Sequence, residues 1–212
     1  MNDFMTLGAA VDLPWDAETE QTRKLTSKTT TLDGNRSRVL GTSEFTETEK
    51  KDVAFEFPLF TTVGVFLLWN PNLYTSLDVG FADWSSFAYD VEGEGKINPF
   101  DGTPHGKSKI DDTWSVRMGT EYLLQWDQRK IEVPLRLGLV WEQRPALGKP
   151  DDYYGFSVGT GIALGDDPGK WIIDFAYSQL RGNNVQTIVP EEEALTSDAA
   201  QHQFFVSVIK HF

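Results

Sequence analysis

Two arginines, Arg117 and Arg136, are the residues of this sequence best suited to hold a charged ligand group. Each falls on the polar side of a segment in which apolar and polar residues alternate. A guanidinium binds a carboxylate through two parallel hydrogen bonds, so the pair could orient a ligand headgroup. The competing interpretation, which we favour, is that the charges pair with one another to satisfy an enclosed interior. The other polar residues on this side are Glu56, Asp78, Glu121, Glu142, Asp174 and Ser178.

Four apolar residues share the side on which these charges lie: Phe60, Phe66, Trp84 and Val140. They could line a track for a hydrophobic ligand, or they could pack against a separate plug. The sequence leaves both interpretations open. The predicted ligand-binding residues are therefore Phe60, Phe66, Trp84, Arg117, Arg136 and Val140.

Catalytic and metal chemistry is not indicated. The three histidines, His105, His202 and His211, have no metal-ligand spacing, and no nucleophile-elbow motif accompanies the Ser, Asp and His residues. The acid-rich segments 165–169 and 191–193 are typical of a tight turn and a solvated loop rather than of a calcium site. We predict no catalytic residue, no metal and no cofactor, and no enzymatic activity.

Composition restricts the class of protein. The 212 residues include 40% apolar residues and no cysteine, so disulfides and thiolate metal sites are ruled out. A formal net charge of -13 argues against the phosphate backbone of a nucleic acid as a partner. The most apolar run, VGVFLLW at 63–69, is far shorter than a membrane helix requires.

Alternation with a period of two predicts eight antiparallel β-strands. Their expected ranges are 5–25, 53–69, 73–91, 113–126, 131–143, 153–165, 170–181 and 201–212. Long polar connections at 26–52, 92–112, 144–152 and 182–200 alternate with tight turns at 70–72, 127–130 and 165–169. All long loops then lie at one end of the sheet. Outer-membrane barrels have this asymmetry, whereas soluble sandwiches have no reason for it.

Aromatic residues gather near both ends of the predicted apolar rows. Near the tight turns or the terminus lie Trp69, Trp126, Trp171 and Phe212, and near the long loops lie Trp114, Trp141, Tyr154, Tyr177 and Phe204. Membrane barrels concentrate aromatic rings at the two headgroup levels, so two such belts favour a lipid-facing surface. In a soluble sandwich the same rows would face a core instead.

Several segments resemble the FadL/TodX-type family of outer-membrane transporters for long-chain fatty acids and other hydrophobic molecules. In the order of that family they are VDLPWDAE at 11–18, FPLFTTVGVFLLWNPNLYTSLDVGFADWSSF at 57–87, DDTWSVRMGTEYLL at 111–124, PLRLGLVWEQRP at 134–145, IDFAYS at 173–178 and QHQFFVSVIKHF at 201–212. The resemblance covers nearly the whole chain and implies the carboxyl-terminal half of a fourteen-stranded barrel that encloses an amino-terminal plug.

We therefore predict an all-β, antiparallel transmembrane β-barrel over residues 1–212, with about eight strands present as part of a larger barrel and with no separate plug domain. The amino terminus already alternates and lacks signal-peptide features, which favours a fragment. The resemblance implies passive transport of hydrophobic molecules such as long-chain fatty acids across the outer membrane of a Gram-negative bacterium. The alternative is a complete eight-stranded barrel with a structural or adhesive surface role.

The expected partners follow from this reading. They are outer-membrane lipid and lipopolysaccharide, a hydrophobic small molecule, and a further chain that supplies missing strands. The terminal Phe212, preceded by alternating apolar residues, resembles the signal that the barrel assembly machinery recognises. No nucleic-acid partner is expected.

Overall fold

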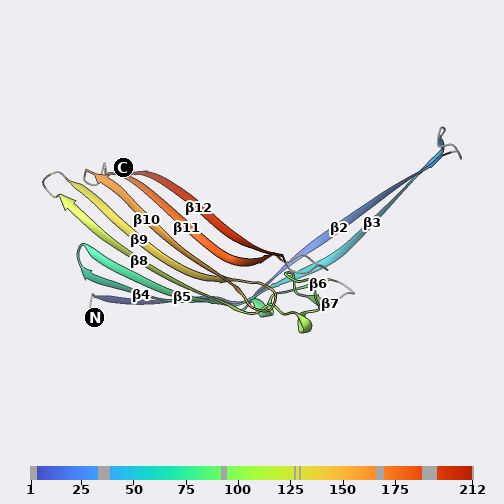
Figure 1. Cartoon of the computed structure of the whole chain (residues 1–212), viewed down its shortest axis with the longest axis horizontal. Coiled ribbons are helices and arrows are strands. Elements are labelled where there is room, and N and C mark those ends of the chain that lie inside the picture. Colours follow the sequence, from blue (N-terminus) through green and yellow to red (C-terminus); the bar gives the residue numbers. More distant parts are fainter. Residues whose placement is uncertain are drawn as a thin grey trace.

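The computed structural model describes residues 4–32, 39–91, 95–126, 128, 130–165, 170–187 and 195–211. The described chain is almost entirely antiparallel β-structure (Figure 1). An eight-stranded sheet has the order β1-β4-β5-β8-β9-β10-β11-β12, and a four-stranded sheet has the order β2-β3-β6-β7. The expected all-β, antiparallel fold class is confirmed at this level.

The eight-stranded sheet pairs strands that are neighbours in the sequence, apart from the pairings of β1 with β4 and of β5 with β8. Its strands are β1 Met5–Asp12, β4 Phe60–Asn70, β5 Leu73–Ala82, β8 Thr113–Trp126, β9 Ile131–Arg144, β10 Asp151–Leu164, β11 Trp171–Thr187 and β12 Leu195–Lys210. β1 and β12 are the two edge strands, so the sheet is open. This agrees with the expectation that the eight strands do not close on themselves.

The smaller sheet corrects the expected strand boundaries. It consists of β2 Trp15–Leu32, β3 Val39–Phe57, β6 Ala88–Val91 and β7 Gly95–Ile97. The expected strand 5–25 is divided at Pro14, and the expected strand 53–69 is divided at Pro58. Proline has no backbone N–H to donate to a ladder, so each proline marks a change of sheet.

A second correction concerns residues 26–52, which were expected to form a polar loop. Residues 26–32 and 39–52 belong instead to β2 and β3, which pair as a hairpin whose register runs from Trp15 opposite Phe57 to Leu32 opposite Val39. The segment is rich in threonine, a β-branched residue that favours extended backbone although both sides of the ribbon are polar. The hairpin projects away from the large sheet (Figure 1).

The expected strand 73–91 is also interrupted. A 3-10 turn, η1 Trp84–Ser86, separates β5 from β6. The Ser86 hydroxyl donates to the Asp83 carbonyl at 2.9 Å, and the Ser85 N–H donates to Asp112 Oδ1 at 3.0 Å. These bonds turn the chain from one sheet into the other.

The expected sorting of loops is confirmed only in part for the large sheet. The connection 145–150 is no longer than the connection 165–170, and β11 and β12 extend through most of the expected loop 182–200. Because its strands are antiparallel, the short connections after β4, β8 and β10 lie at one end. The β2–β3 excursion and the connections after β5, β9 and β11 lie at the other end, which we call the loop end. A second 3-10 turn, η2 His105–Lys107, belongs to this end.

Buried side chains are few and gather mostly at the loop end. In the described part of the chain, the buried hydrophobic residues are Val53, Ala88, Ile110, Ala146, Tyr153 and Ala163. Ile110 bridges to Leu147, and the Gly148 N–H donates to the Lys109 carbonyl at 2.8 Å. These contacts join the β7–β8 connection to the β9–β10 connection at the loop end. Most of the small core therefore lies at this end and not against a face of the sheet.

Asp101 fixes the connection between β7 and β8. Its carboxylate accepts hydrogen bonds from the Thr103 N–H at 3.0 Å, the Thr103 hydroxyl at 2.8 Å, the Ser108 hydroxyl at 2.9 Å and the Lys109 N–H at 3.3 Å. Burial acts to raise the pKa of Asp101, but these bonds favour the ionised carboxylate and hold the pKa below its usual value.

We predict that Asp101→Asn loosens this connection, because an amide cannot accept all four hydrogen bonds. Local opening should become easier by about 1–3 kcal/mol, measured by hydrogen exchange of the Thr103 and Lys109 amides. Exposed Asp111→Asn is the matched control and should leave exchange unchanged. Since the folded pKa is depressed, protection should be full above pH about 4 and should fall as the pH drops through the folded pKa. Equal exchange in both variants would contradict this role.

Candidate functional site

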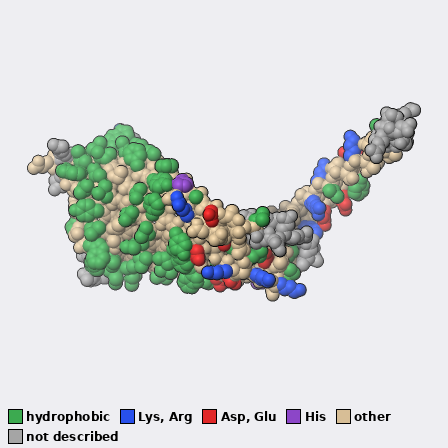
Figure 2. Space-filling view, viewed as in Figure 1, with side chains coloured by type: hydrophobic (Ala, Val, Ile, Leu, Met, Phe, Trp, Pro, Cys, Tyr) green, Lys and Arg blue, Asp and Glu red, His purple; other side chains and the backbone are tan. Residues whose placement is uncertain are grey.

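One face of the large sheet is apolar and exposed; we call it the apolar face. Register places its residues in continuous cross-strand rows, such as Leu77 opposite Met118, Met118 opposite Leu139, and Leu139 opposite Phe156. Leu135, Leu137 and Leu139 on β9 are all about half exposed. Figure 2 shows hydrophobic side chains spread across the sheet and charged ones gathered toward the hairpin. A patch of this extent is far larger than a soluble monomer leaves uncovered.

Aromatic residues border this face at both ends. At the loop end, Phe81 contacts Trp114 with ring centroids 4.9 Å apart. Tyr177 contacts Phe204 at the same separation, but this pair lies in the middle of β11 and β12, with Tyr177 opposite Val158, and not near the loop end as expected. At the turn end, the Lys210 ammonium lies 5.0 Å from the ring centroid of Trp171. Phe212, which was expected to belong to the same group of aromatic residues as Trp171, lies outside the described residues.

The spacing of the two belts can be compared with a bilayer. Trp114 and Trp126 are twelve residues apart on β8, which is about 40 Å along a strand. At a tilt of roughly 45° this length spans about 28 Å, close to the hydrocarbon thickness of roughly 30 Å. The apolar face therefore has the height that a bilayer requires.

The opposite face, which we call the polar face, carries small and charged side chains. It includes glycines that neighbouring polar side chains overlie: a Cβ on Gly80 would lie 2.6 Å from Ser115 Oγ, and one on Gly119 would lie 3.2 Å from Ser76 Oγ. Larger residues at these positions would force the neighbouring hydroxyls away. Glycine thus allows polar side chains to lie flat against the sheet and leaves space above them.

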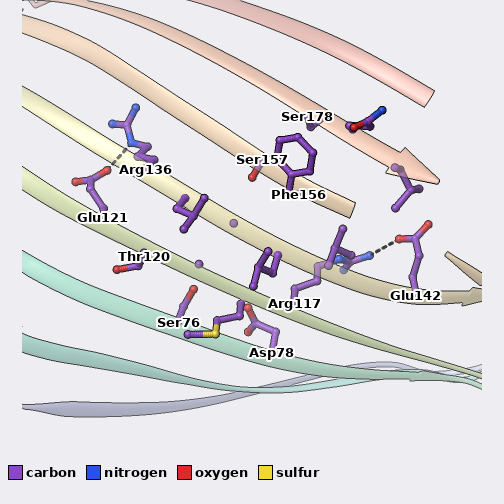
Figure 3. A pocket seen from close by; sticks show the side chains of 18 of the residues that line it. Ser76, Asp78, Arg117, Thr120, Glu121, Arg136, Glu142, Phe156, Ser157 and Ser178 are labelled. Atoms are coloured by element: carbon purple, nitrogen blue, oxygen red, sulfur yellow. Dashed lines mark hydrogen bonds and ion pairs between the residues drawn. The ribbon is translucent and has the colours of Figure 1, made fainter. Parts of the chain in front are cut away.

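This space forms a hollow of about 580 Å³ over the middle strands (Figure 3). Its wall includes three of the predicted ligand residues, Arg117, Arg136 and Val140. Ser157 and Ser178 also line it, together with Gln201 and Gln203 on the edge strand β12. Sequence reasoning missed both glutamines, although their position between the apolar residues of β12 would have placed them on this face.

Arg136 is held by two acids. Its Nε donates to Glu121 Oε2, and its Nη1 donates to Asp174 Oδ1 at 2.6 Å. Register accounts for this arrangement, because Glu121 lies directly opposite Arg136 on the neighbouring strand β8. The favoured interpretation, in which the charges pair with one another, is therefore confirmed for Arg136.

Arg117 is held more loosely. Its guanidinium lies 3.5 Å from Glu142 Oε2, and 61% of its side chain is exposed. Glu142 is shared with Arg144, whose Nη2 lies 3.0 Å from Oε1. Asp78 lies directly opposite Arg117 on β5. Every arginine of this face thus has at least one acid beside it.

The three aromatic ligand candidates lie elsewhere. Phe66 borders a separate hollow of about 390 Å³ beside β1, where its ring contacts Tyr74 at 5.1 Å. Phe60 and Trp84 are 5.3 Å apart and line a hollow of about 300 Å³ at the loop end, which Arg117 also borders. Trp84 was expected in a strand but lies in η1. There its ring also contacts Phe87 and Phe100.

Glu56, which was expected beside these charges, lies elsewhere. It belongs to β3 in the smaller sheet and pairs with Lys96 at 2.5 Å. The change of sheet at Pro58 explains this outcome, because it separates Glu56 from β4.

The three histidines lie on separate elements: His105 on η2, His202 on β12 and His211 directly after β12. His202 lies at the edge of the apolar face, where its Nδ1 is 2.8 Å from the Tyr177 hydroxyl. Among the described residues no group of three potential metal ligands occurs, and no helix has the length and apolar character needed to cross a bilayer. The acidic run 191–193 lies outside the described residues.

Comparison with known proteins finds no matching family model and no matching curated protein. Function must therefore be inferred from the two faces of the large sheet. One face is exposed, apolar and bordered by aromatic residues, and the other is hollowed and carries paired charges.

We predict that the two faces differ in their surroundings, and the absence of native cysteine allows single spin labels to be placed. Labels at Leu137 and Val158 should collide with dissolved oxygen, because their side chains lie on the apolar face. Labels at Ser157 and Ser178 should collide with a water-soluble nickel chelate. Serines are chosen because a Cβ on Gly138 would meet Ser157 Oγ. Equal access of the chelate to all four labels in lipid vesicles would contradict the assignment.

Proposed function

We propose that the eight-stranded sheet is part of a transmembrane β-barrel in the outer membrane of a Gram-negative bacterium, where hydrophobic molecules diffuse passively along its polar face. The observation that carries this proposal is the exposure of the apolar face over the full height between its aromatic belts. Exposing these apolar side chains to water would cost free energy, whereas exposing them to the hydrocarbon of a lipid bilayer does not. Lipopolysaccharide and outer-membrane lipid are then its immediate surroundings.

A soluble sandwich is disfavoured because it needs a second layer over the apolar face. The smaller sheet does not supply this layer, since β2 and β3 project beyond the loop end (Figure 1). Leu137 and Leu139 on β9 are 50% and 55% exposed. Burying one such side chain is worth about 1.5–3 kcal/mol, so a whole uncovered face would be costly in water.

The open edges support a larger barrel. In hydrocarbon, each unsatisfied backbone group costs several kcal/mol, so β1 and β12 must pair with further strands. We propose that additional strands, on this or another chain, complete the barrel. The resemblance to the FadL/TodX-type transporters is consistent with such a partial sheet, and recognition through Phe212 by the assembly machinery belongs to the same proposal.

The transport role is inferred from the hollows. A water-filled porin lumen is uniformly polar, whereas this face combines paired charges with apolar side chains such as Val140 and Phe66. A hydrophobic molecule could contact these side chains in sequence and leave again, because no single hollow encloses it.

A structural or adhesive role is the second candidate. The observation that favours it is the β2–β3 hairpin, a polar ribbon that projects from the loop end. A closed eight-stranded barrel would fill its interior with side chains. The hollow over the middle strands and the open edges agree less well with that candidate.

The proposal predicts faster entry of an uncharged hydrophobic probe into cells that carry the protein. The probe is N-phenyl-1-naphthylamine, whose fluorescence rises when it passes the outer membrane. Ser157→Trp should remove most of the added rate, because the indole fills the hollow. The matched control is Val158→Trp, which changes the next residue but places the indole in lipid. A rate that the protein does not raise, or that both variants lower equally, would contradict transport through this face.

A further inference from the structure

The charges of the hollow suggest which hydrophobic molecules it admits, an inference that rests on the proposed function. Arg136 has Glu121 on one side and Asp174 on the other, so this group of three carries a net charge of -1. In the neighbouring group, Arg117 and Arg144 share Glu142, and Asp78 lies opposite Arg117 in the register. Each of these three guanidinium groups lies beside an acid, and of the three only Arg136 donates to two.

A ligand carboxylate that reached Arg136 would have to displace one of its two acids. It would meet Arg136 only by moving Glu121 or Asp174 from its hydrogen bond. The displaced carboxylate would then lie near another negative charge in a medium of low dielectric constant, where like charges repel strongly. Glu121 is only 13% exposed as a side chain and Asp174 only 24%, so water cannot readily replace the lost bond.

An uncharged molecule meets no such penalty, and an apolar surface is present beside the charged group. Val140 and Leu180 both approach the backbone at Gly155, where an added Cβ would lie 2.9 Å from a methyl carbon of each. Both side chains therefore lie over Gly155 and form a small apolar surface, and both line the same hollow as Arg136. An alkyl or aromatic group can cover this surface without disturbing the acids.

We propose that the part of this hollow around Arg136 admits uncharged hydrophobic molecules and excludes carboxylates, and that Glu121 and Asp174 determine this specificity by holding Arg136. Arg136, which the sequence suggested as a partner for a ligand headgroup, is already bonded to these two acids and so does not bind an anionic ligand. Long-chain fatty acids in their ionised form are thus poorer ligands than uncharged molecules of the same chain length.

The test uses the full chain in outer-membrane vesicles, with Ser157→Cys as the single cysteine in the hollow. Its labelling rate is measured with two methanethiosulfonate reagents of similar size, one bearing a trimethylammonium group and one a sulfonate. Each rate is then measured again in the presence of 1-decanol or of decanoate. We expect the cationic reagent to label faster, and decanol to slow labelling while decanoate at the same concentration does not.

Releasing Arg136 should reverse this preference. In the Glu121→Gln, Asp174→Asn background the ratio of cationic to anionic labelling should fall about tenfold, and decanoate should now protect the cysteine. Asp174→Asn alone keeps the ion pair between Arg136 and Glu121, so it should lower the ratio of cationic to anionic labelling by a smaller factor. This single variant serves as the test if the double variant does not insert into the membrane. Glu44→Gln, on the projecting hairpin, removes one acid far from the hollow and should change nothing.

The outcomes separate the two proposals. Decanoate that protects the unmodified hollow as well as decanol does, or a labelling ratio unchanged by both Arg136-releasing variants, would overturn the specificity while leaving transport intact. Labelling that neither compound slows would instead contradict binding of hydrophobic molecules here, and would overturn the proposed function together with this inference.

Discussion

The register between antiparallel strands is the constraint on which the rest of the molecule depends. Side chains alternate between faces, so eight strands in register sort every residue to one face or the other. A slip of one residue between β8 and β9 would place Leu139 beside Arg117 and Leu135 beside Glu121, and would expose charge to the apolar side. The cross-strand pair of Glu121 and Arg136 and the row through Met118 and Leu139 thus favour the same alignment.

That sorting gives the polar face its unusual combination of features. Glycines such as Gly80 and Gly119 keep it hollow, because polar neighbours lie over them. The acids then satisfy the arginines within the wall, where unpaired charge would be costly. A hydrophobic molecule that passes along this face would meet arginines that already have acids beside them, and Arg136 links β9 to both β8 and β11 through its two acids.

Much of the large sheet could be predicted from sequence, because strict alternation survives in its middle strands. The expected range 113–126 coincides with β8, and β9 differs from its expected range by one residue. The hairpin could not be found in this way, since both of its sides are polar and only threonine content distinguishes strand from loop. For the site, parity placed Arg117, Arg136 and Val140 together, but it could not reveal that Glu56 lies in another sheet or that Arg136 has two acids.

The central claim is that lipid covers the apolar face, and tryptophan fluorescence tests it most directly. Trp69, Trp114, Trp126 and Trp171 are about half exposed near the ends of the strands of this face. In vesicles of brominated lipids, the full chain should be quenched strongly by bromine placed near the headgroups and less by bromine at the bilayer centre. Fluorescence that no brominated lipid quenches, from a chain that still has its β-structure by circular dichroism, would contradict the claim.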